Sequence, residues 1–508
     1  MERIMVGRGP LTEADVVRVA RDGVGVELAP DAVQAIGESR KTVETLAHDV
    51  EPHYGISTGF GALATTQIPA DRRAALQRSL IRSHAAGSGA EVEREVVRAM
   101  MLLRLSTLAT GRTGVRPETA AALCVLLDAG ITPVVHEYGS LGCSGDLAPL
   151  AHVALALMGE GWVRDGSGVL RPAADVVKPI ELAEKEGLAL INGTDGMLGQ
   201  LLLAATDFDR LLRTADISAA MSVEALLGTD RVFAADLVAL RPQPGQAVAA
   251  ANMRALLADS PIIASHAPPD CSYVQDAYSM RCAPQVAGAA RDTLAHARTV
   301  ATYELAAAVD NPVVTLDGRV ESNGNFHGAP LGYVLDFLAI TAADLASMSE
   351  RRTDRMLDAA RSRGLPAFLA SDPGVDSGHM IAQYTQAALV SELKRLAVPA
   401  SVDSIPSSAM QEDHVSMGWS AARKLRRSLA GLTQVLAIEL LTAARALDLR
   451  APLAPGPATS SVAGALRSTV DGPAPDRFLA PEIEAAVEFV SSGEAVAAAD
   501  AVLPERLR

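Results

Sequence analysis

The chain has 508 residues, of which 49% are hydrophobic and only 3% aromatic, and its formal net charge is −15. This length and apolar content allow a large core, and the shortage of aromatic residues favours aliphatic, alanine-rich helices over sheets. The negative charge argues against nucleic acid or an anionic membrane as a partner.

The sequence shows no sign of secretion or of a metal site. Its four cysteines are scattered, at spacings that match no zinc template and suit a reducing cytosol: Cys124, Cys143, Cys271 and Cys282. The first residues lack the apolar core of a signal peptide, and no uninterrupted apolar run reaches the length of a membrane span. We therefore expect a cytoplasmic protein with no metal and no membrane partner.

Helical periodicity and capping residues predict a mainly α fold. The first predicted helices, the first of them with Thr12 as its N-cap, are residues 11–20, 31–48, 72–83, 91–110 and 117–129. Longer, largely apolar helices follow and indicate a buried bundle: residues 194–227, 285–309, 331–358, 378–397 and 418–447. Helices this apolar exceed what one subunit covers, which favours an oligomer.

Shorter elements complete the predicted organisation. Residues 162–174 and 313–320 are hairpin-like, and residues 451–457 form a linker-like break before a helical tail. We divide the chain into an N-terminal region (1–195), a central long-helix bundle (196–449) and a C-terminal tail (450–508).

The stretch 139–149 is the most unusual part of the chain. Gly142 and Gly145 bracket a Cys-Ser pair, so the backbone can fold on itself with little Cβ interference. Asp146 occupies the N-cap position of the apolar run that follows. Ser144 is therefore expected in a tight turn at the positive end of a helix.

Two chemical interpretations of this turn compete with an ordinary helix cap. A nucleophilic serine would require Gly-x-Ser-x-Gly on a strand-to-helix elbow, but here the second glycine comes one position early and residues 131–138 make a poor strand. The alternative is cyclisation, in which the Gly145 nitrogen attacks the Cys143 carbonyl and Ser144 loses water. The product is a methylidene-imidazolone ring, which is a strong electrophile. For a bare Ser-Gly pair, the ordinary cap would be preferred.

The longer string resembles the signature of the aromatic amino acid ammonia-lyase and aminomutase family, Gly-Ser-x-Gly-Ala-Ser-Gly-Asp-Leu-Ala-Pro-Leu. It differs only at Cys143, where the family has alanine. That side chain becomes a substituent of the ring and takes no part in closing it. The resemblance therefore implies a 4-methylidene-imidazol-5-one formed from Cys143, Ser144 and Gly145, with no external cofactor.

Two further strings match the family closely. Tyr54 begins the glycine-punctuated loop Tyr-Gly-Ile-Ser-Thr-Gly-Phe-Gly, and the resemblance implies a mobile lid with Tyr54 as the catalytic base. Asn192 ends the string Gly-Leu-Ala-Leu-Ile-Asn before Gly-Thr. Alone, an Asn-Gly pair is often a turn, but the family uses this asparagine to hold the substrate carboxylate or the ring carbonyl.

Another set of candidates lies further along the chain. Gln275, Tyr278 and Arg281 are three residues apart and would share one face of a helix. Arginine can bind a carboxylate with two hydrogen bonds, although a buried Arg–Asp pair is the ordinary alternative. The resemblance implies that Arg281 binds the substrate carboxylate and that Tyr278 is a supporting acid or base. Phe326 matches the family phenylalanine beside the ring, although a lone Phe is more often core.

His84 and Glu412 bear on the choice of substrate. The string Ser-His-Ala-Ala-Gly around His84 and the string Gln-Glu-Asp-His around Glu412 resemble those of family members that act on histidine. Without that resemblance, the histidine would be a cap or a surface group, and the Glu-Asp pair a solvated charge run. Relatives specific for phenylalanine usually carry apolar residues at the position of His84, and relatives that act on tyrosine or phenylalanine usually show Asn-Gln-Asp in the second string.

The resemblance extends from about residue 54 to about residue 449. It implies a helical homotetramer of the ammonia-lyase/fumarase type with shared active sites, which converts L-histidine to trans-urocanate and ammonia, the first step of histidine degradation. The amine would add to the carbon derived from Ser144, and a tyrosine phenolate would remove the β-proton. The rival hypotheses are a tyrosine or phenylalanine lyase or aminomutase, and an inactive helical scaffold whose turn never cyclises.

Overall fold

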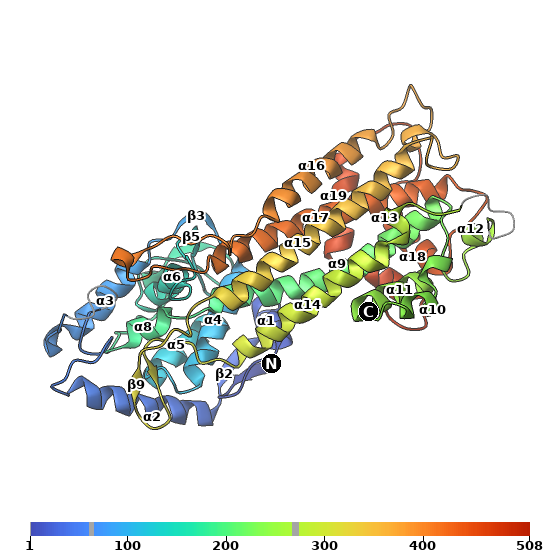
Figure 1. Cartoon of the computed structure of the whole chain (residues 1–508). Helices are drawn as coiled ribbons and strands as arrows, with labels where there is room; N and C mark the ends of the chain where they lie inside the picture. The colour runs from blue at the N-terminus through green and yellow to red at the C-terminus, as the bar shows by residue number, and fades with distance from the viewer. Residues whose placement is uncertain (1, 60–65, 267–273) are drawn as a thin grey trace. The chain divides into compact units, whose positions relative to one another are not determined.

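The computed structural model describes residues 2–59, 66–266 and 274–508 (Figure 1). It is mainly helical, as predicted, and divides into two compact units. Unit 1 comprises Met1–Leu203, Ala297–Asp336 and Pro399–Arg423, and unit 2 comprises Ala204–His296, Phe337–Val398 and Lys424–Arg508. The three-region division at residues 195 and 449 stays a prediction.

Unit 1 contains the shorter helices of the first part of the chain. They are α1 (Glu13–Arg21), α2 (Pro30–Ala47), α3 (Arg73–His84), α4 (Arg94–Ala109), α5 (Pro117–Asp128), α6 (Leu147–Leu157), α7 (Ala173–Val176) and α8 (Glu186–Ile191). Thr12 caps α1 as predicted: its hydroxyl accepts from the Asp15 amide at 3.1 Å, and the Asp15 carboxylate accepts from the Thr12 amide at 3.0 Å. The two bonds form a capping box.

Four of the five points at which the chain passes between the units fall within long helices. These helices are α9 (Asp195–Ala225), α14 (Ala283–Leu305), α15 (Ala329–Leu357) and α17 (Gly418–Asp448). The helices of unit 2 are α10 (Ala235–Ala239), α11 (Pro244–Leu256), α12 (Pro261–Ala264), α13 (Tyr278–Arg281), α16 (Met380–Leu396), α18 (Pro457–Leu466), α19 (Ala480–Ser491) and α20 (Glu494–Asp500). The predicted helices lie within four residues of the observed bounds.

The strands are short, and all of them belong to unit 1. They are β1 (Arg3–Val6), β2 (Gly25–Leu28), β3 (Ser88–Glu91), β4 (Thr132–Pro133), β5 (His136–Tyr138), β6 (Trp162–Arg164), β7 (Leu170–Pro172), β8 (Val313–Val314) and β9 (Val320–Glu321). β1 and β2 pair in parallel, whereas β3–β5, β4–β6–β7 and β8–β9 pair antiparallel. The two predicted hairpins are therefore present as β6–β7 and β8–β9.

The expectation for residues 131–138 needs correction, because both β4 and β5 lie there. Each is only two or three residues long and pairs with a strand distant in sequence, β6 or β3. Pro133 is accommodated because β4 is at the edge of its sheet, where a missing amide donor breaks no ladder. Short pairings of this kind leave little periodicity in the sequence.

The core of unit 1 positions the helix ends that later form the site. α4 is buried from Val96 to Ala109 and packs against α1 and α5. α3 packs against α6 and α8, which also contact each other. His84 is the last residue of α3, and Asn192 directly follows α8. Ser144 lies in the turn just before α6.

In unit 2, α15, α16 and α17 lie side by side (Figure 1). Buried Arg352 on α15 pairs with Glu439 on α17 through bonds of 2.5 and 2.9 Å. Gln386 on α16 donates to the Val435 carbonyl of α17 at 2.9 Å. A buried ion pair of this kind must keep both partners, because a single remaining charge would be strongly destabilising.

Three described segments are long and apolar enough to cross a membrane by length and composition alone. They are Glu186–Ala225, Ala329–Leu357 and Gly418–Asp448, and their most apolar windows are 100, 61 and 78% buried inside the structure. The most apolar stretch of 18 residues in each segment contains at most two charged residues. The burial shows that these helices use their apolar faces for packing within the chain.

Candidate active site

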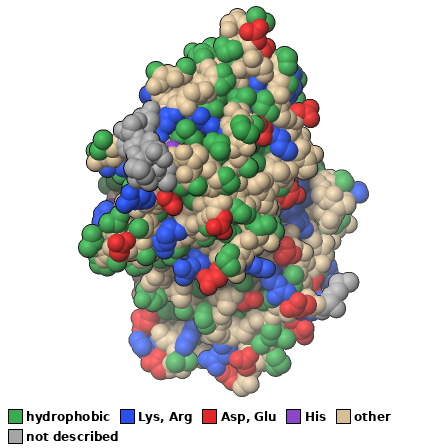
Figure 2. Space-filling model, turned by 90° about the vertical axis from the view of Figure 1, so that its right-hand side faces the viewer, with side chains coloured by type: hydrophobic (Ala, Val, Ile, Leu, Met, Phe, Trp, Pro, Cys, Tyr) green, Lys and Arg blue, Asp and Glu red, His purple; other side chains and the backbone are tan. Residues whose placement is uncertain are grey.

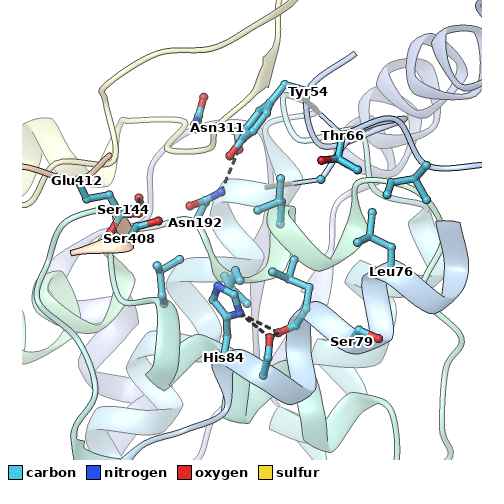
Figure 3. A pocket seen from close by; sticks show the side chains of 17 residues that line it. Tyr54, Thr66, Leu76, Ser79, His84, Ser144, Asn192, Asn311, Ser408 and Glu412 are labelled. Carbon is cyan, nitrogen blue, oxygen red and sulfur yellow. Dashed lines mark hydrogen bonds between the residues drawn. The ribbon is translucent and has the colours of Figure 1, made fainter. Parts of the chain in front are cut away.

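A cavity in unit 1 brings together five of the residues singled out in the sequence. It has a volume of about 470 Å³, and its lining includes Tyr54, His84, Ser144, Asn192 and Glu412 (Figure 3). These residues come from segments up to several hundred positions apart, so only the folded chain brings them together.

The turn that carries Ser144 is held by a buried hydroxyl and a buried carboxylate. The Ser140 hydroxyl donates to Asp146 Oδ1 at 2.9 Å and accepts from the Gly142 amide at 3.2 Å. Asp146 Oδ2 accepts from the Met197 amide at 2.9 Å, and the Asp146 amide donates to the Gly193 carbonyl at 2.7 Å. These bonds join the turn to the start of α9.

Asp146 occupies the predicted N-cap position of α6, but its side chain does not make the hydrogen bond that a capping residue usually makes. The carboxyl group is fully buried and is used by Ser140 and by the amide of Met197 instead. Burial raises its pKa to about 7, against the opposing effect of these donors.

Gly142 and Gly145 are required by the geometry of the turn. Both have left-handed backbones, with φ of 66° and 80°. A Cβ at Gly145 would lie 2.1 Å from the Gly193 carbonyl oxygen, and one at Gly142 would lie 2.2 Å from the Ser416 hydroxyl. The clash at Gly145 is with backbone and has no easy relief, so this position accepts only glycine.

Ser144 and Glu412 are in contact in the lining of the cavity. Its hydroxyl donates to Glu412 Oε1 at 3.3 Å, while Glu412 Oε2 accepts from the Ser407 hydroxyl at 2.9 Å. Ser408, which follows Ser407 and lines the cavity, has a φ of 51° and begins three consecutive left-handed non-glycine residues. Backbone strain of this kind persists only where the surroundings enforce it and is frequent at functional sites.

Cys143 lies in the turn as a buried thiol, with only 8% of its surface exposed. Burial, together with the nearby negative charge of Glu412, raises the pKa of this thiol to about 12. Because the thiolate is the reactive form of cysteine, Cys143 stays protonated at neutral pH and is not a nucleophile here.

His84 ends α3 with its ring half-buried at the cavity. Its Nδ1 lies 2.9 Å from the Leu80 carbonyl oxygen and 3.1 Å from the Ser83 hydroxyl (Figure 3). Burial lowers the pKa of His84, while the Leu80 carbonyl and the charge of Glu412 oppose that shift. A carbonyl can only accept, so the proton of the neutral ring is assigned to Nδ1, and Nε2 is left as an acceptor.

Asn192 is held in place by two contacts. Its Nδ2 donates to the Asn311 carbonyl oxygen at 2.9 Å. The backbone carbonyl of Asn192 accepts from Arg104 Nη1 at 2.6 Å, and Arg104 Nη2 donates to the backbone carbonyl of Val309 at 2.8 Å. The buried guanidinium of Arg104 therefore connects the segment before α9 to the segment after α14.

Sequence reasoning missed Arg104, Asn311 and Ser408 as parts of the site. Arg104 had a detectable signal, because it is the single charge in the apolar stretch 99–109 of α4, and a charge buried there requires a partner. Asn311 and Ser408 lie outside the strings quoted above, and only the fold brings them to the cavity.

The structure places the other predicted residues elsewhere. Phe326 is half-buried and is not among the described residues that line the cavity. Gln275, Tyr278 and Arg281 belong to unit 2 and are likewise absent from that lining. Within the predicted lid loop, Phe60 and Gly61 lie outside the described residues.

The expected helical face with three functional groups needs correction. α13 is a single turn that begins at Tyr278, so Gln275 lies before it. The Arg281 guanidinium stacks over the Tyr278 ring, with Cζ 4.6 Å from the ring centroid, and Tyr278 is 70% exposed. The predicted face runs from Gln275 to Arg281, but the structure retains only Tyr278–Arg281 in a helix.

The chain resembles known proteins along its whole length. A model of the aromatic amino acid lyase family matches residues 11–468. The chain is 64% identical over 508 residues to a histidine ammonia-lyase of Streptomyces avermitilis, covering 99% of each chain. The chain belongs to the aromatic amino acid lyase family.

Two solved structures show the same fold. A tyrosine aminomutase from Streptomyces globisporus matches with a TM-score of 0.93 at 38% identity, covering 100% of both chains. A histidine ammonia-lyase from Trypanosoma cruzi matches with a TM-score of 0.91 at 38% identity, covering 99% of this chain and 96% of that one. The expected helical fold and the family resemblance are confirmed, but the fold does not separate the substrates of these two proteins.

Proposed function

We propose that the chain catalyses the non-oxidative deamination of L-histidine to trans-urocanate and ammonia, the activity of a histidine ammonia-lyase and the first step of histidine degradation. The observation that carries the proposal is that one cavity holds His84 and Glu412 together with Ser144 and Tyr54. A relative named histidine ammonia-lyase at 64% identity supports it.

The proposal includes a 4-methylidene-imidazol-5-one formed from Cys143, Ser144 and Gly145. The residues fit this group, because a Cβ at Gly145 would meet the Gly193 backbone and the turn is held on both sides by Ser140 and Asp146. Once formed, the group would supply the electrophile that no unmodified side chain offers. Only the backbone of Cys143 enters the ring, so its thiol does not prevent closure.

The side chains around the cavity have distinct proposed tasks. Neutral His84 offers Nε2 as an acceptor to an N–H of the substrate imidazole. Glu412 accepts from the other ring nitrogen when that nitrogen carries a proton. Tyr54 removes the β-proton as a general base, and Asn192, fixed by Arg104 and Asn311, orients the substrate carboxylate or the ring carbonyl.

The direct test is a product assay. Purified protein mixed with L-histidine should develop the ultraviolet absorbance of urocanate and release ammonia in equal amounts. Product from tyrosine or phenylalanine, with none from histidine, would favour the rival lyase or aminomutase. A chain that acts on none of the three and retains the mass of its unmodified sequence would be the inactive scaffold.

Replacing His84 with leucine and Glu412 with glutamine, separately, tests the choice of substrate. His84→Leu leaves a buried imidazole nitrogen without its partner, and Glu412→Gln replaces a charged acceptor by a neutral amide, each at a cost of about 1–3 kcal/mol. We therefore expect kcat/KM for histidine to fall by about tenfold to a hundredfold, with residual activity shifted towards phenylalanine. Steady-state kinetics on histidine, phenylalanine and tyrosine provide the measurement.

The matched control for His84→Leu is His136→Leu. His136 is also half-buried, and its Nδ1 lies 3.1 Å from the Gly89 carbonyl, but it does not line the cavity among the described residues. His136→Leu should keep the histidine kinetics of the parent protein. Unchanged histidine kinetics in both cavity variants would overturn the substrate assignment and leave the ammonia-lyase assignment standing.

We further infer a cytoplasmic homotetramer in which Gln275, Tyr278, Arg281 and Phe326 complete the active site of another subunit. The exposure of Tyr278 and of Gln275 supports this, since both are available to a second copy. Arg281 would then bind the substrate carboxylate with its fixed pair of donors.

Mixing two variants that are each impaired on their own tests whether two subunits contribute residues to one active site. Tyr54→Phe and Arg281→Ala chains should each be weak alone. Hybrid tetramers, made by unfolding and refolding the mixture, should regain activity, because some sites combine an intact Tyr54 from one chain with an intact Arg281 from another. Hybrids verified by native mass spectrometry that remain inactive would place both residues in the same chain's site.

A further inference from the structure

A second hollow lies within unit 2 and is rich in arginine. It has a volume of about 320 Å³, and its described lining includes Gln275, Asp276, Arg355, Arg361 and Arg363. We call it the arginine pocket. Arg355 lies in the last turn of α15, and the other two arginines follow that helix. Three guanidinium groups therefore share this hollow with a single carboxylate.

Two of the three arginines are already paired. Arg363 Nη2 lies 3.0 Å from Asp276 Oδ1, and Asp276 Oδ2 also accepts from the Thr229 amide at 2.7 Å. Arg361 pairs with Asp354 at 2.8 Å and with Asp358 at 2.5 Å. The nearby carboxylates are thus engaged by these two guanidinium groups and by backbone.

Arg355 differs from its two neighbours. In the described part of the chain it has neither a hydrogen bond nor an ion pair. Burial lowers its pKa, and the positive charges of Arg361 and Arg363 lower it further, while Asp276 and Asp354 oppose the shift. Arginine nevertheless keeps its proton in proteins, so Arg355 brings to the pocket a charged guanidinium group whose five donors have no partner among the described residues.

On the face shown in Figure 2, basic and acidic side chains lie interspersed, and the chain as a whole carries a net charge of −15. A half-buried cation beside two like charges is costly unless an anion joins them. The guanidinium group matches the oxygens of phosphate or carboxylate with two parallel hydrogen bonds.

We propose that the arginine pocket binds a small oxyanion, with Arg355 as its principal donor. Arg361 and Arg363 supply positive potential. A free phosphate and the carboxylate of a small metabolite share this chemistry. The site is separate from the cavity of unit 1, since Arg355, Arg361 and Arg363 are not among the residues described as lining that cavity.

Labelling of arginine tests the proposal on the intact protein. The protein in an anion-poor buffer is treated with phenylglyoxal, with and without inorganic phosphate or acetate, and the modified peptides are quantified by mass spectrometry. Arg355 should react readily, and phosphate, acetate or both should slow its reaction. The internal control is Arg319, which is exposed and paired with Asp317 at 2.7 Å, and its labelling should not change.

The two anions separate the two sources of the ligand. Protection by phosphate alone indicates a phosphate site, and protection by acetate alone indicates a carboxylate site. Protection by neither anion would overturn the proposal. An Arg355 that fails to react in anion-poor buffer would overturn it as well, because another group would then already cover the guanidinium.

Binding measurements on variants provide a second test. Calorimetric titration with the protecting anion should show binding weakened by about tenfold or more in Arg355→Gln, the scale of one charge-assisted hydrogen bond. Arg355→Lys keeps the charge, and its affinity for the anion should lie between that of the parent protein and that of Arg355→Gln. The matched control is Arg351→Gln on the same helix, where Arg351 is paired with Glu350 at 2.5 Å. If anion binding is weakened equally in Arg351→Gln, the loss reflects the overall charge of the protein, and the proposed site is overturned.

Discussion

Replacing Ser144 with alanine should abolish urocanate formation while leaving the fold nearly unchanged. Alanine has no hydroxyl to lose as water, so the exocyclic methylene of the proposed electrophile cannot form. The structural cost is small, because before cyclisation the Ser144 hydroxyl makes one hydrogen bond among the described residues, to Glu412 at 3.3 Å, worth about 1 kcal/mol. Intact mass spectrometry, urocanate absorbance and thermal unfolding should be measured on the same preparation.

Cys143→Ala is the matched control for this experiment. It changes the adjacent residue, and the ring requires only the backbone of that residue, so the variant should mature and retain activity. The parent protein and Cys143→Ala should both be lighter than their translated sequences by two waters, about 36 Da, as expected for a backbone modification of this kind. A folded but inactive Cys143→Ala would show that the thiol has a role beyond that of a passive substituent.

The features of the site that could be predicted depend on short-range geometry. Gly142 and Gly145 were expected to allow a tight turn, and both have positive φ. The hairpin at residues 162–174 was equally predictable, because the turn before β7 is closed locally: Asp165 Oδ1 accepts from the Ser167 amide at 2.9 Å. In each case the residues that decide the conformation are within a few positions of one another.

The features that could not be predicted depend on contacts between distant segments. Asp146 has the residue type and position of an N-cap, but the fold brings the Met197 amide to its carboxylate and buries it. Arg104 acts on Asn192, 88 residues away, through a bond that no spacing rule describes. Helical spacing suggested that Gln275 shares a face with Arg281, whereas tertiary structure shortens that helix to one turn.

Replacing Tyr54 with phenylalanine should lower kcat for histidine by about two orders of magnitude or more, the usual effect of losing a general base. Phenylalanine keeps the ring that lines the cavity and removes only the phenolic oxygen, so KM should change much less. An unperturbed tyrosine has a pKa of about 10, and a phenolate base should make kcat/KM rise with pH on the acidic side. Tyr54→Phe should lose that slope.

The control for Tyr54→Phe is Tyr138→Phe, which removes the same oxygen from an exposed tyrosine of β5 in the same unit. Its kcat and pH profile should match those of the parent protein. If Tyr54→Phe keeps near-normal turnover and its pH slope, Tyr54 is not the base, and the role passes to Tyr278. In that case Tyr278→Phe should show the large loss, and because Tyr278 is exposed on unit 2, the proton would be removed by a residue that the cavity itself does not contain.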